Sequence, residues 1–363
     1  TMKFNTKCVH GSGKPDSTGA ISPAIYMSST FTHPGLGETT GFQYTRESNP
    51  TRDRLETLIA GLEEGTDAIA FSSGMAAVDA VFHLFSPGDH VILGDDLYGG
   101  SIRLFTNIYE KNGVEFTYVG TSDLDAVQAA FKPNTKAVYI ETPTNPMMEI
   151  TDVRALSKMA HDRNALVIVD NTFLSPYFQK PLHLGADIVV HSGTKFIGGH
   201  HDVISGFTIV KDDELAAQLR LIYKTVGACL SAFDSWLVIR GIKTLALRME
   251  QHQKNAVALA EWLKQEPKVT KVLFPGLPEH PGYEVNKSQT TGFGGMLSFE
   301  VDSEETAKQV LEGIQLIQFA ESLGGTESLL TYPVTQTHPD LKPEDAERKG
   351  ITRRLLRLSV GIE

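Results

Sequence analysis

The stretches ALVIVD at residues 165–170 and DIVVHSGTK at residues 187–195 decide the fold. Each is a short run of apolar, mostly β-branched residues that ends on polar side chains, and neither alternates between apolar and polar positions. Such runs are typical of strands that are buried on both faces of a mostly parallel sheet. We therefore expect an α/β sheet with helices on both sides and ligand-binding groups where its strands end.

Similar runs recur along the chain and alternate with stretches of helical periodicity, which predicts a doubly wound α/β domain. The expected strands are 68–71, 90–93, 116–119, 137–140, 165–169, 187–190 and 206–210, with helices over 73–85 and 152–163. Beyond about residue 212 the pattern changes and favours a smaller α+β domain. We expect there a single helix over 234–264, strands at 269–274, 295–301 and 355–360, a helix at 303–312, and a loop over 275–294.

Residues 1–60 are rich in Gly, Ser, Thr and Pro and are predicted to be irregular. Irregular segments of this length are usually either disordered or functional. The aromatic residues and arginines within this one indicate that it docks onto another surface. The predicted organisation is therefore an N-terminal arm (1–60), an α/β domain (61–233) and a C-terminal α+β domain (234–363).

Composition excludes several classes of protein. The 363 residues include 33 Lys and Arg against 44 Asp and Glu, and the formal charge of −11 argues against a nucleic-acid partner. Two cysteines, Cys8 and Cys229, cannot build a disulfide scaffold and fit a reducing cytosol. We see no apolar run of membrane-spanning length and no secretory signal, so we expect a cytoplasmic protein without a membrane partner. The pair His200-His201 lacks the spacing of a metal motif, and no metal is expected.

Polar residues follow several of the predicted strands. Gly74 and Met75 open a helix after a strand, a position that suits a phosphate. Tyr98, Asp170 and Lys195 each follow another strand. Taken singly, these three have ordinary explanations as a half-buried aromatic, a helix cap and a surface lysine. Taken together they match the needs of pyridoxal phosphate, whose aldehyde joins a lysine and whose ring nitrogen is kept protonated by an acid.

Six segments, in order, match a known family. The segment ADIVVHSGTKFIGGH at 186–200 resembles the signature of the Cys/Met-metabolism pyridoxal-phosphate enzymes, which include cystathionine γ-lyases, γ-synthases and β-lyases. The other five segments are YTRESNPT (44–51), DLYGG (96–100), ETPTNP (141–146), AESLGG (320–325) and LRLSVG (356–361). The resemblance covers essentially the whole chain and implies the aminotransferase-like arrangement called fold type I. In the family a C-terminal helix follows the position of Glu363.

The resemblance also implies roles for individual residues. Lys195 would carry the cofactor and move protons, and Tyr98 would stack on the ring and assist catalysis. The implied cofactor-binding set is Tyr44, Arg46, Gly74, Met75, Tyr98, Asp170, Thr172, Ser192, Thr194 and Lys195. Among these, Tyr44 and Arg46 would reach the phosphate of a neighbouring subunit, which implies a dimer of dimers with shared sites. The implied substrate-binding set is Asn145, Glu321, Ser322 and Arg357, with Arg357 holding the α-carboxylate.

The activity implied by the resemblance is an α,γ-elimination that converts L-cystathionine to L-cysteine, 2-oxobutanoate and ammonia. Glu321 matches members that handle the distal amino group of cystathionine, and Gly100 stands where methionine γ-lyases have a cysteine. Thr337-His338-Pro339 departs from the usual Thr-His-Ala. The γ-replacement of the synthases and the β-elimination of the β-lyases stay open as alternatives.

Two readings outside this family are weaker. A serine acyl-enzyme would use Ser192 and Lys195 as an S-x-x-K pair, but its companion motifs are missing from the sequence. A binding protein that kept the fold without the chemistry would have no need of Lys195, Asp170 and Arg357 together.

Overall fold

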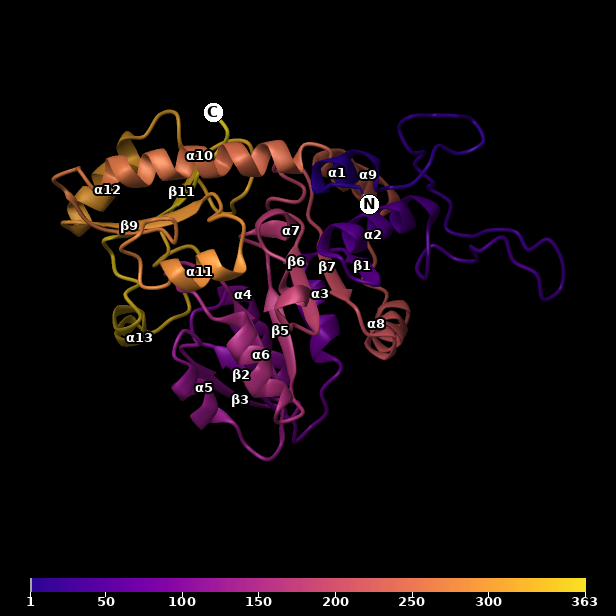
Figure 1. The fold of residues 1–363 in the computed structure, drawn as a ribbon, viewed down its shortest axis with the longest axis horizontal. Helices are drawn as coiled ribbons and strands as arrows, with labels where there is room; N and C mark the ends of the chain where they lie inside the picture. Colours follow the sequence, from indigo (N-terminus) through magenta and orange to yellow (C-terminus); the bar gives the residue numbers. More distant parts are fainter. Residues whose placement is uncertain (1) are drawn as a thin grey trace.

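The structure is a computed structural model that describes residues 2–363 and contains two β-sheets (Figure 1). The larger sheet has seven strands in the order β1-β7-β6-β5-β4-β2-β3. Strand β7 is antiparallel to both of its neighbours, and the other pairs are parallel. The strands are β1 (Asp67–Phe71), β2 (His90–Gly94), β3 (Glu115–Val119), β4 (Thr135–Glu141), β5 (Leu166–Asp170), β6 (Ile188–Ser192) and β7 (Gly206–Val210). The expected mostly parallel sheet is confirmed.

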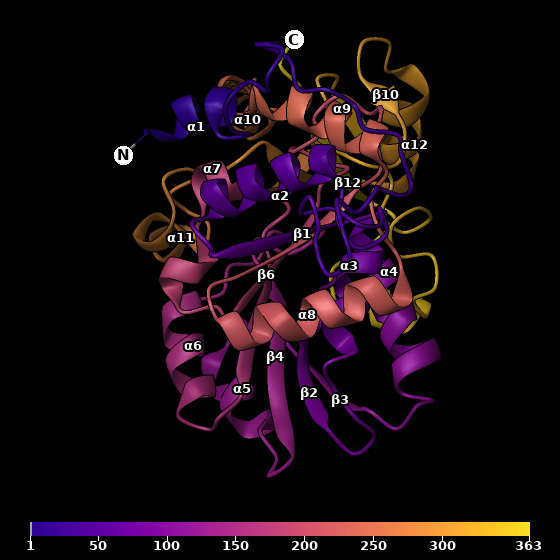
Figure 2. The same ribbon diagram turned by 90° about the vertical axis from the view of Figure 1, so that its right-hand side faces the viewer.

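Helices cover both faces of this sheet, as the non-alternating strands require. One face packs against α3 (Gly74–Phe82), α4 (Gly99–Leu104) and α8 (Asp213–Val226). The other packs against α2 (Pro50–Glu63), α5 (Leu124–Ala130) and α6 (Val153–His161). Figure 2 shows α8 crossing in front of the strands. Along each strand successive side chains alternate between the α3 face and the α2 face.

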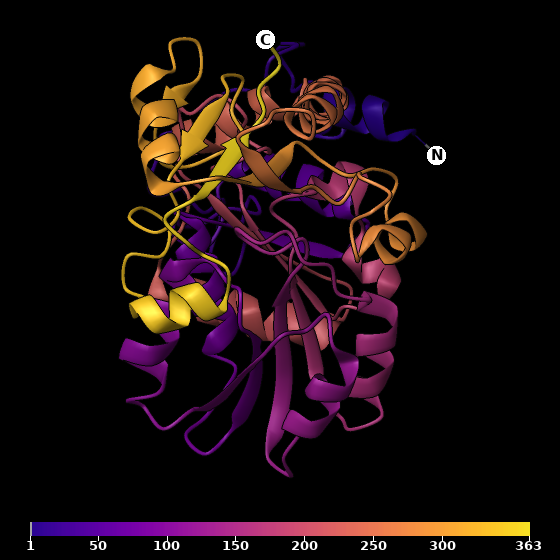
Figure 3. The same cartoon turned by 90° about the vertical axis from the view of Figure 1, so that its left-hand side faces the viewer.

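The smaller sheet has five strands in the order β10-β11-β12-β9-β8, and all pairs are antiparallel except β10 with β11. Figure 3 shows it, in orange and yellow, above the larger sheet. Its strands are β8 (Val269–Leu273), β9 (Met296–Val301), β10 (Gln318–Phe319), β11 (Leu329–Thr331) and β12 (Leu355–Ser359). Leu356 and Leu358 of β12 point into the local core with α10 (Leu245–Leu263), so the alternate residue Arg357 points the other way.

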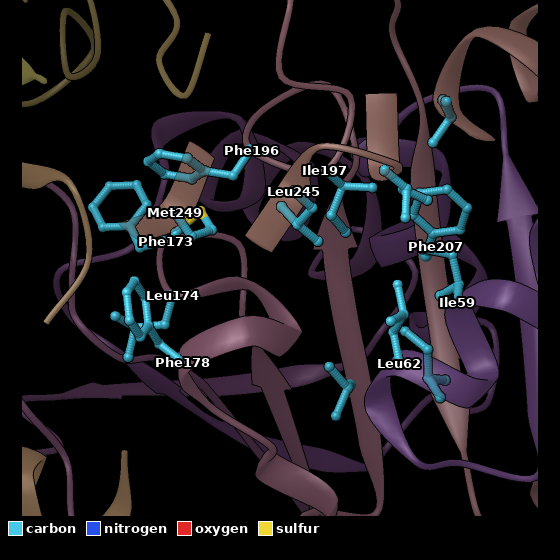
Figure 4. Packing of buried hydrophobic residues seen from close by; sticks show 14 of the residues in the cluster. Ile59, Leu62, Phe173, Leu174, Phe178, Phe196, Ile197, Phe207, Leu245 and Met249 are labelled. Carbon is cyan, nitrogen blue, oxygen red and sulfur yellow. The ribbon is translucent and has the colours of Figure 1, made fainter. Parts of the chain in front are cut away.

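One hydrophobic cluster joins the two sheets. It contains residues of α2, β6, β7 and α10 together with Met296 and Leu355 of the smaller sheet. Figure 4 shows Phe173, Phe196 and Met249 next to one another, with Phe207 and Ile59 on the opposite side of the cluster. Because Phe196 directly follows Lys195, this packing holds the chain around the lysine.

The stretch predicted to be an irregular arm is helical at both ends, which corrects the expectation. It contains α1 (Phe4–His10) and the first eleven residues of α2. Helix α2 has a clear start, since the Asn49 side chain accepts hydrogen bonds from the amides of Thr51 and Arg52, and Pro50 occupies its first position. Between these two helices the chain loops away from the body of the molecule (Figure 1).

The single helix expected over 234–264 is two helices, α9 (Ala232–Ile242) and α10. The reason is tertiary: Gly241 lies so close to Gly198 that a Cβ atom would collide with its carbonyl, and the Gly241 carbonyl accepts a hydrogen bond from Arg248 Nη2 at 2.8 Å. Within the expected loop at 275–294 the chain forms α11 (Tyr283–Gln289). Its Gln289 side chain bonds to the amide of Val153 and the carbonyl of Thr151, at the start of α6.

The remaining helical segments are short or peripheral. They are η1 (Phe105–Tyr109), α7 (Ser175–Phe178), η2 (Pro181–Leu184), α12 (Glu304–Gly313) and α13 (Pro343–Arg348). Helix α12 confirms the helix expected at 303–312. Within residues 2–363, no helix combines the length and the apolar composition that crossing a membrane would take.

Candidate active site

A cavity of about 310 Å³ lies where the carboxyl ends of β4, β5 and β6 meet β12. Twelve of the fourteen residues singled out from the sequence line it: Gly74, Met75, Tyr98, Asn145, Asp170, Thr172, Ser192, Thr194, Lys195, Glu321, Ser322 and Arg357. Tyr44 and Arg46 do not line it. Arg46 instead contacts the carbonyl of Lys224, and Tyr44 is about half exposed.

One end of the cavity can hold an anion. The N-terminus of α3 opens there with Gly74 and Met75, and Ser192 and Thr194 line the same cavity. A Cβ atom on Gly74 would lie 2.9 Å from Cβ of Ser192, so glycine lets the helix approach β6 closely. Backbone N–H groups and the positive end of a helix dipole favour a phosphate at such a position.

Two carboxyl groups end neighbouring strands. Asp170 and Glu141 are directly paired across β5 and β4. Asp170 accepts hydrogen bonds from the Thr172 amide at 3.0 Å and the Thr172 hydroxyl at 2.5 Å. Burial raises the pKa of Asp170, and burial together with the charge of Asp170 holds the pKa of Glu141 well above its usual range. A cationic group facing Asp170 would offset its burial.

Lys195 lies in the turn after β6. Its Nζ atom donates a hydrogen bond to Oγ of Ser322 at 2.8 Å. Burial lowers the pKa of Lys195 to about 8, with a further lowering from the charge of Arg357 and an opposing effect from Glu321. A lysine with this pKa is partly unprotonated near neutral pH and can act as a nucleophile or a base. The turn is held by Arg248, whose Nη1 donates to the Phe196 carbonyl at 2.6 Å.

Arg357 comes from β12 and is almost completely buried. Its Nη1 atom donates to Oδ1 of Asn145 at 2.9 Å, and its Nη2 atom donates to the Ser322 carbonyl at 2.9 Å and to Oγ1 of Thr331 at 3.2 Å. Its Nε atom has no hydrogen-bond partner in the described part of the chain. Burial lowers the pKa of Arg357 to about 10. An oriented guanidinium with an unpaired donor suits a carboxylate ligand.

Tyr98 stands at the N-terminus of α4, and its amide donates to Oε1 of Glu141 at 2.9 Å. A Cβ atom on Gly100 would collide with the Tyr98 ring, so the position of the ring depends on glycine there. Glu321 also lines the cavity, and its charge acts on the pKa of both Lys195 and Arg357.

The cavity includes residues that the sequence reasoning assigned no role. Ser101, Glu141, Phe173, Ile204, Gln336 and Thr337 are among them. Glu141 could have been found by the argument that found Asp170, because it too ends a predicted buried strand. Thr337 belongs to the segment Thr337-His338-Pro339, which the family resemblance brought out, while no local signal singled out Gln336, which precedes it.

Pyridoxal phosphate fits these groups. The α3 N-terminus would accommodate the phosphate, Asp170 would pair with the ring nitrogen, and Lys195 would join the aldehyde. The unpaired Nε of Arg357 leaves a place for the carboxylate of an amino acid. Fold and cavity together define an enzyme of the pyridoxal-phosphate class with the fold type I arrangement.

Comparison with known proteins identifies the family within that class. The family model described as "Cys/Met metabolism PLP-dependent enzyme" matches residues 5–363. A cystathionine beta-lyase of Lactococcus lactis is 49% identical over 361 residues, which are 99% of this chain and 95% of that protein. A cystathionine gamma-synthase of Haemophilus influenzae is 50% identical over 97% of this chain and 92% of that protein.

A solved structure is similar to this chain in fold as well as in sequence. The crystal structure of cystathionine gamma-lyase from Lactobacillus plantarum, complexed with L-serine, superposes with a TM-score of 0.96 at 46% identity and covers 100% of this chain and 95% of that one. The chain belongs to the Cys/Met-metabolism pyridoxal-phosphate-dependent enzymes.

Proposed function

We propose that the enzyme is a carbon–sulfur lyase that cleaves L-cystathionine by α,γ-elimination to L-cysteine, 2-oxobutanoate and ammonia. The observation that carries the proposal is that Arg357, Lys195 and Glu321 line one cavity. Cystathionine has an amino acid group at each end. Arg357 suits the carboxylate of the reacting end, and Glu321 offers a carboxylate to the distal ammonium group.

The choice of cystathionine over methionine as the substrate rests on two positions. Glu321 matches members that handle the distal amino group of cystathionine. Methionine γ-lyases have a cysteine where this chain has Gly100. A Cβ atom at position 100 would collide with the Tyr98 ring, which supports the view that the position of this ring depends on glycine.

In the proposed reaction the bound cofactor supplies an electron sink for the charge released at the substrate α-carbon. Arg357 holds the α-carboxylate, while its two Nη atoms stay fixed by Asn145 and Thr331. Lys195 Nζ removes the α-proton and later returns a proton within the cavity, which its pKa of about 8 allows. Asp170 would hold the ring nitrogen protonated, and the Tyr98 ring would lie against the cofactor ring.

The test is the identity of the keto acid formed when the purified holoenzyme is incubated with L-cystathionine. We expect 2-oxobutanoate and cysteine in equal amounts, with the Lys195→Ala enzyme as the inactive control. Pyruvate and homocysteine as the main products would overturn the γ-elimination in favour of the β-elimination for which the Lactococcus relative is named. Cystathionine formed readily from an O-acylhomoserine and cysteine would instead assign the γ-replacement.

A further inference from the structure

Four polar side chains form a buried cluster behind the cavity, on the α2 face of the larger sheet. They are Glu63, Asn171, Gln179 and His191, and none is more than 1% exposed. Glu63 is the last residue of α2, and the other three come from the chain after β5, the chain after α7, and β6. The proposed reaction uses none of them.

The cluster is centred on one carboxylate oxygen. His191 Nε2 lies 2.6 Å from Oε1 of Glu63, and Nδ2 of Asn171 donates to the same oxygen at 2.9 Å. Nε2 of Gln179 donates to Oδ1 of Asn171 at 3.0 Å and to the Thr142 carbonyl at 3.2 Å. Oε2 of Glu63 and Nδ1 of His191 have no partner among residues 2–363, while Nδ2 of Asn171 also donates to the carbonyls of Gln179 at 2.9 Å and Ser175 at 3.3 Å.

Each strand end that the cluster contacts also carries a residue of the cavity. Asn171 follows Asp170, His191 precedes Ser192, and Thr142 follows Glu141. Because side chains alternate between faces, Asp170 and Ser192 point into the cavity while Asn171 and His191 point to α2. The cluster therefore links the ends of β4, β5 and β6 from the side opposite the cavity.

We propose that Glu63 is a positioning residue of the active site, which fixes the strand ends that carry Asp170 and Ser192 by holding Asn171 and His191. The proposal rests on the placement of pyridoxal phosphate in the cavity. Two further titratable groups face the cluster. Burial lowers the pKa of Lys180, and the charge of Glu63 opposes this lowering. Asp170, whose pKa is raised by burial, lies on the other side of the sheet. Glu63 thus supports the geometry of the strand ends that face the cofactor.

The test compares two isosteric variants on the same helix. Glu63→Gln keeps the shape of the side chain and removes its charge. Glu56→Gln does the same at a fully buried position that bonds to Ala70 and Arg220, away from the cluster. We expect Glu63→Gln to raise the dissociation constant of the apoenzyme for pyridoxal phosphate about tenfold, as for the loss of one hydrogen bond to a charged group. When the holoenzyme is titrated with pH, its visible absorption changes. We also expect Glu63→Gln to shift the pH at which half of this change has occurred.

Glu56→Gln should lower the midpoint of thermal unfolding and leave the absorption midpoint at its parental value. If Glu63→Gln binds the cofactor as tightly as Glu56→Gln does and keeps the parental absorption midpoint, the proposal is overturned. If Glu63→Gln does not fold, the affinity for pyridoxal phosphate is measured in Gln179→Leu instead. We expect this variant to lose about threefold in cofactor affinity. An unchanged affinity in Gln179→Leu would equally overturn the proposal. None of these measurements uses the keto acid product, so the proposed substrate can fail without affecting this result.

Discussion

Ser322 connects the two cationic side chains of the cavity. Its hydroxyl accepts from Lys195 Nζ, and its carbonyl accepts from Arg357 Nη2. The residue has a φ of 76°, a left-handed conformation that is uncommon outside glycine. Backbone strain of this kind persists where the surrounding structure requires it. Here it lets one residue orient the amine and the guanidinium at the same time.

Lys195 gives the first prediction. Lys195→Ala should lower kcat by at least about 10³-fold, because no other amine lines the cavity among the described residues. Borohydride reduction followed by peptide mass mapping should label the peptide containing position 195 in the parent enzyme and not in the variant. A labelled variant, or an unlabelled parent saturated with cofactor, would contradict the assigned role.

The pKa of Lys195 gives a pH dependence. Only the unprotonated amine attacks the aldehyde, and burial lowers this pKa from its usual value to about 8. The rate at which apoenzyme captures pyridoxal phosphate should therefore rise about tenfold per pH unit below 8 and level off above it. Stopped-flow absorption measures this rate. A rate that keeps rising through pH 10 would indicate an ordinary exposed lysine.

Arg357→Lys should mainly impair substrate capture. A lysine is a point charge and cannot keep the bonds to Asn145, Ser322 and Thr331 while offering a second donor to the carboxylate. We expect KM for cystathionine to rise about tenfold or more, with a smaller change in kcat. The control is Arg353→Lys, an exposed arginine of the same segment that contacts Glu304 at 3.3 Å. Equal effects at the two positions would contradict the role of Arg357.

At the scale of elements, the anion site depends on how closely β7 approaches the start of α3. Gly206, the first residue of β7, pairs with Phe71 of β1. A Cβ atom at position 206 would collide with the Ser73 carbonyl and lie 2.7 Å from the Gly74 amide. The helix N-terminus can therefore reach its position only because β7 has no side chain at this point.

Gly206→Ala should displace the N-terminus of α3 and weaken the binding of pyridoxal phosphate by about tenfold or more, since the lost interaction is with a charged group. Equilibrium titration of the apoenzyme measures the effect. Gly313→Ala at the end of α12 is the matched control, because a Cβ atom there has no neighbour within 4 Å. Unchanged affinity in Gly206→Ala would show that α3 does not bind the phosphate.

The elements also show where sequence reasoning is reliable. All seven strands of the larger sheet were predicted, because strands buried on both faces are continuous apolar runs. Helix α2 was missed although its signals are local: Asn49-Pro50 at its start and the spacing of Leu55, Ile59 and Leu62. The break between α9 and α10 had no local signal, because it depends on the contact of Gly241 with Gly198 and on Arg248.

At the scale of the whole molecule, the segment between α1 and α2 exposes apolar side chains. Ile21, Met27 and Leu36 are 88%, 73% and 106% exposed, which is unusual for residues of this kind in one segment. The same segment carries Tyr44 and Arg46, which lie outside the cavity of their own chain. This exposure agrees with the expectation that the arm docks onto a neighbouring subunit, which stays a prediction.

A mixing experiment tests the shared site. Arg46→Ala should weaken cofactor retention, and Lys195→Ala should be inactive. At a cofactor concentration too low to load the Arg46→Ala variant, both variants alone lack activity. If Arg46 serves the neighbouring subunit, hybrids of the two variants contain one intact site for each pair, and activity returns on mixing. If Arg46 acts within its own chain, no hybrid contains an intact site and activity stays absent. Sedimentation of the mixture checks that hybrids of at least two subunits form.

The sequence by itself determined the class of the sheet, its strands and the chemical groups at their ends. Strand burial and the polar residues after each strand are properties of short segments, and the lysine, the acid and the arginine stand in motifs that can be read locally. The order of strands, with β7 antiparallel between β1 and β6, was decided only by the tertiary structure. The tertiary structure also decides that β12, which carries Arg357, lies against the carboxyl ends of the larger sheet's strands. Contacts such as those of Ser322 with Lys195 and of Glu63 with His191 join residues more than a hundred positions apart. The first exists only once the two sheets have packed together, and the second only once α2 has packed on the larger sheet.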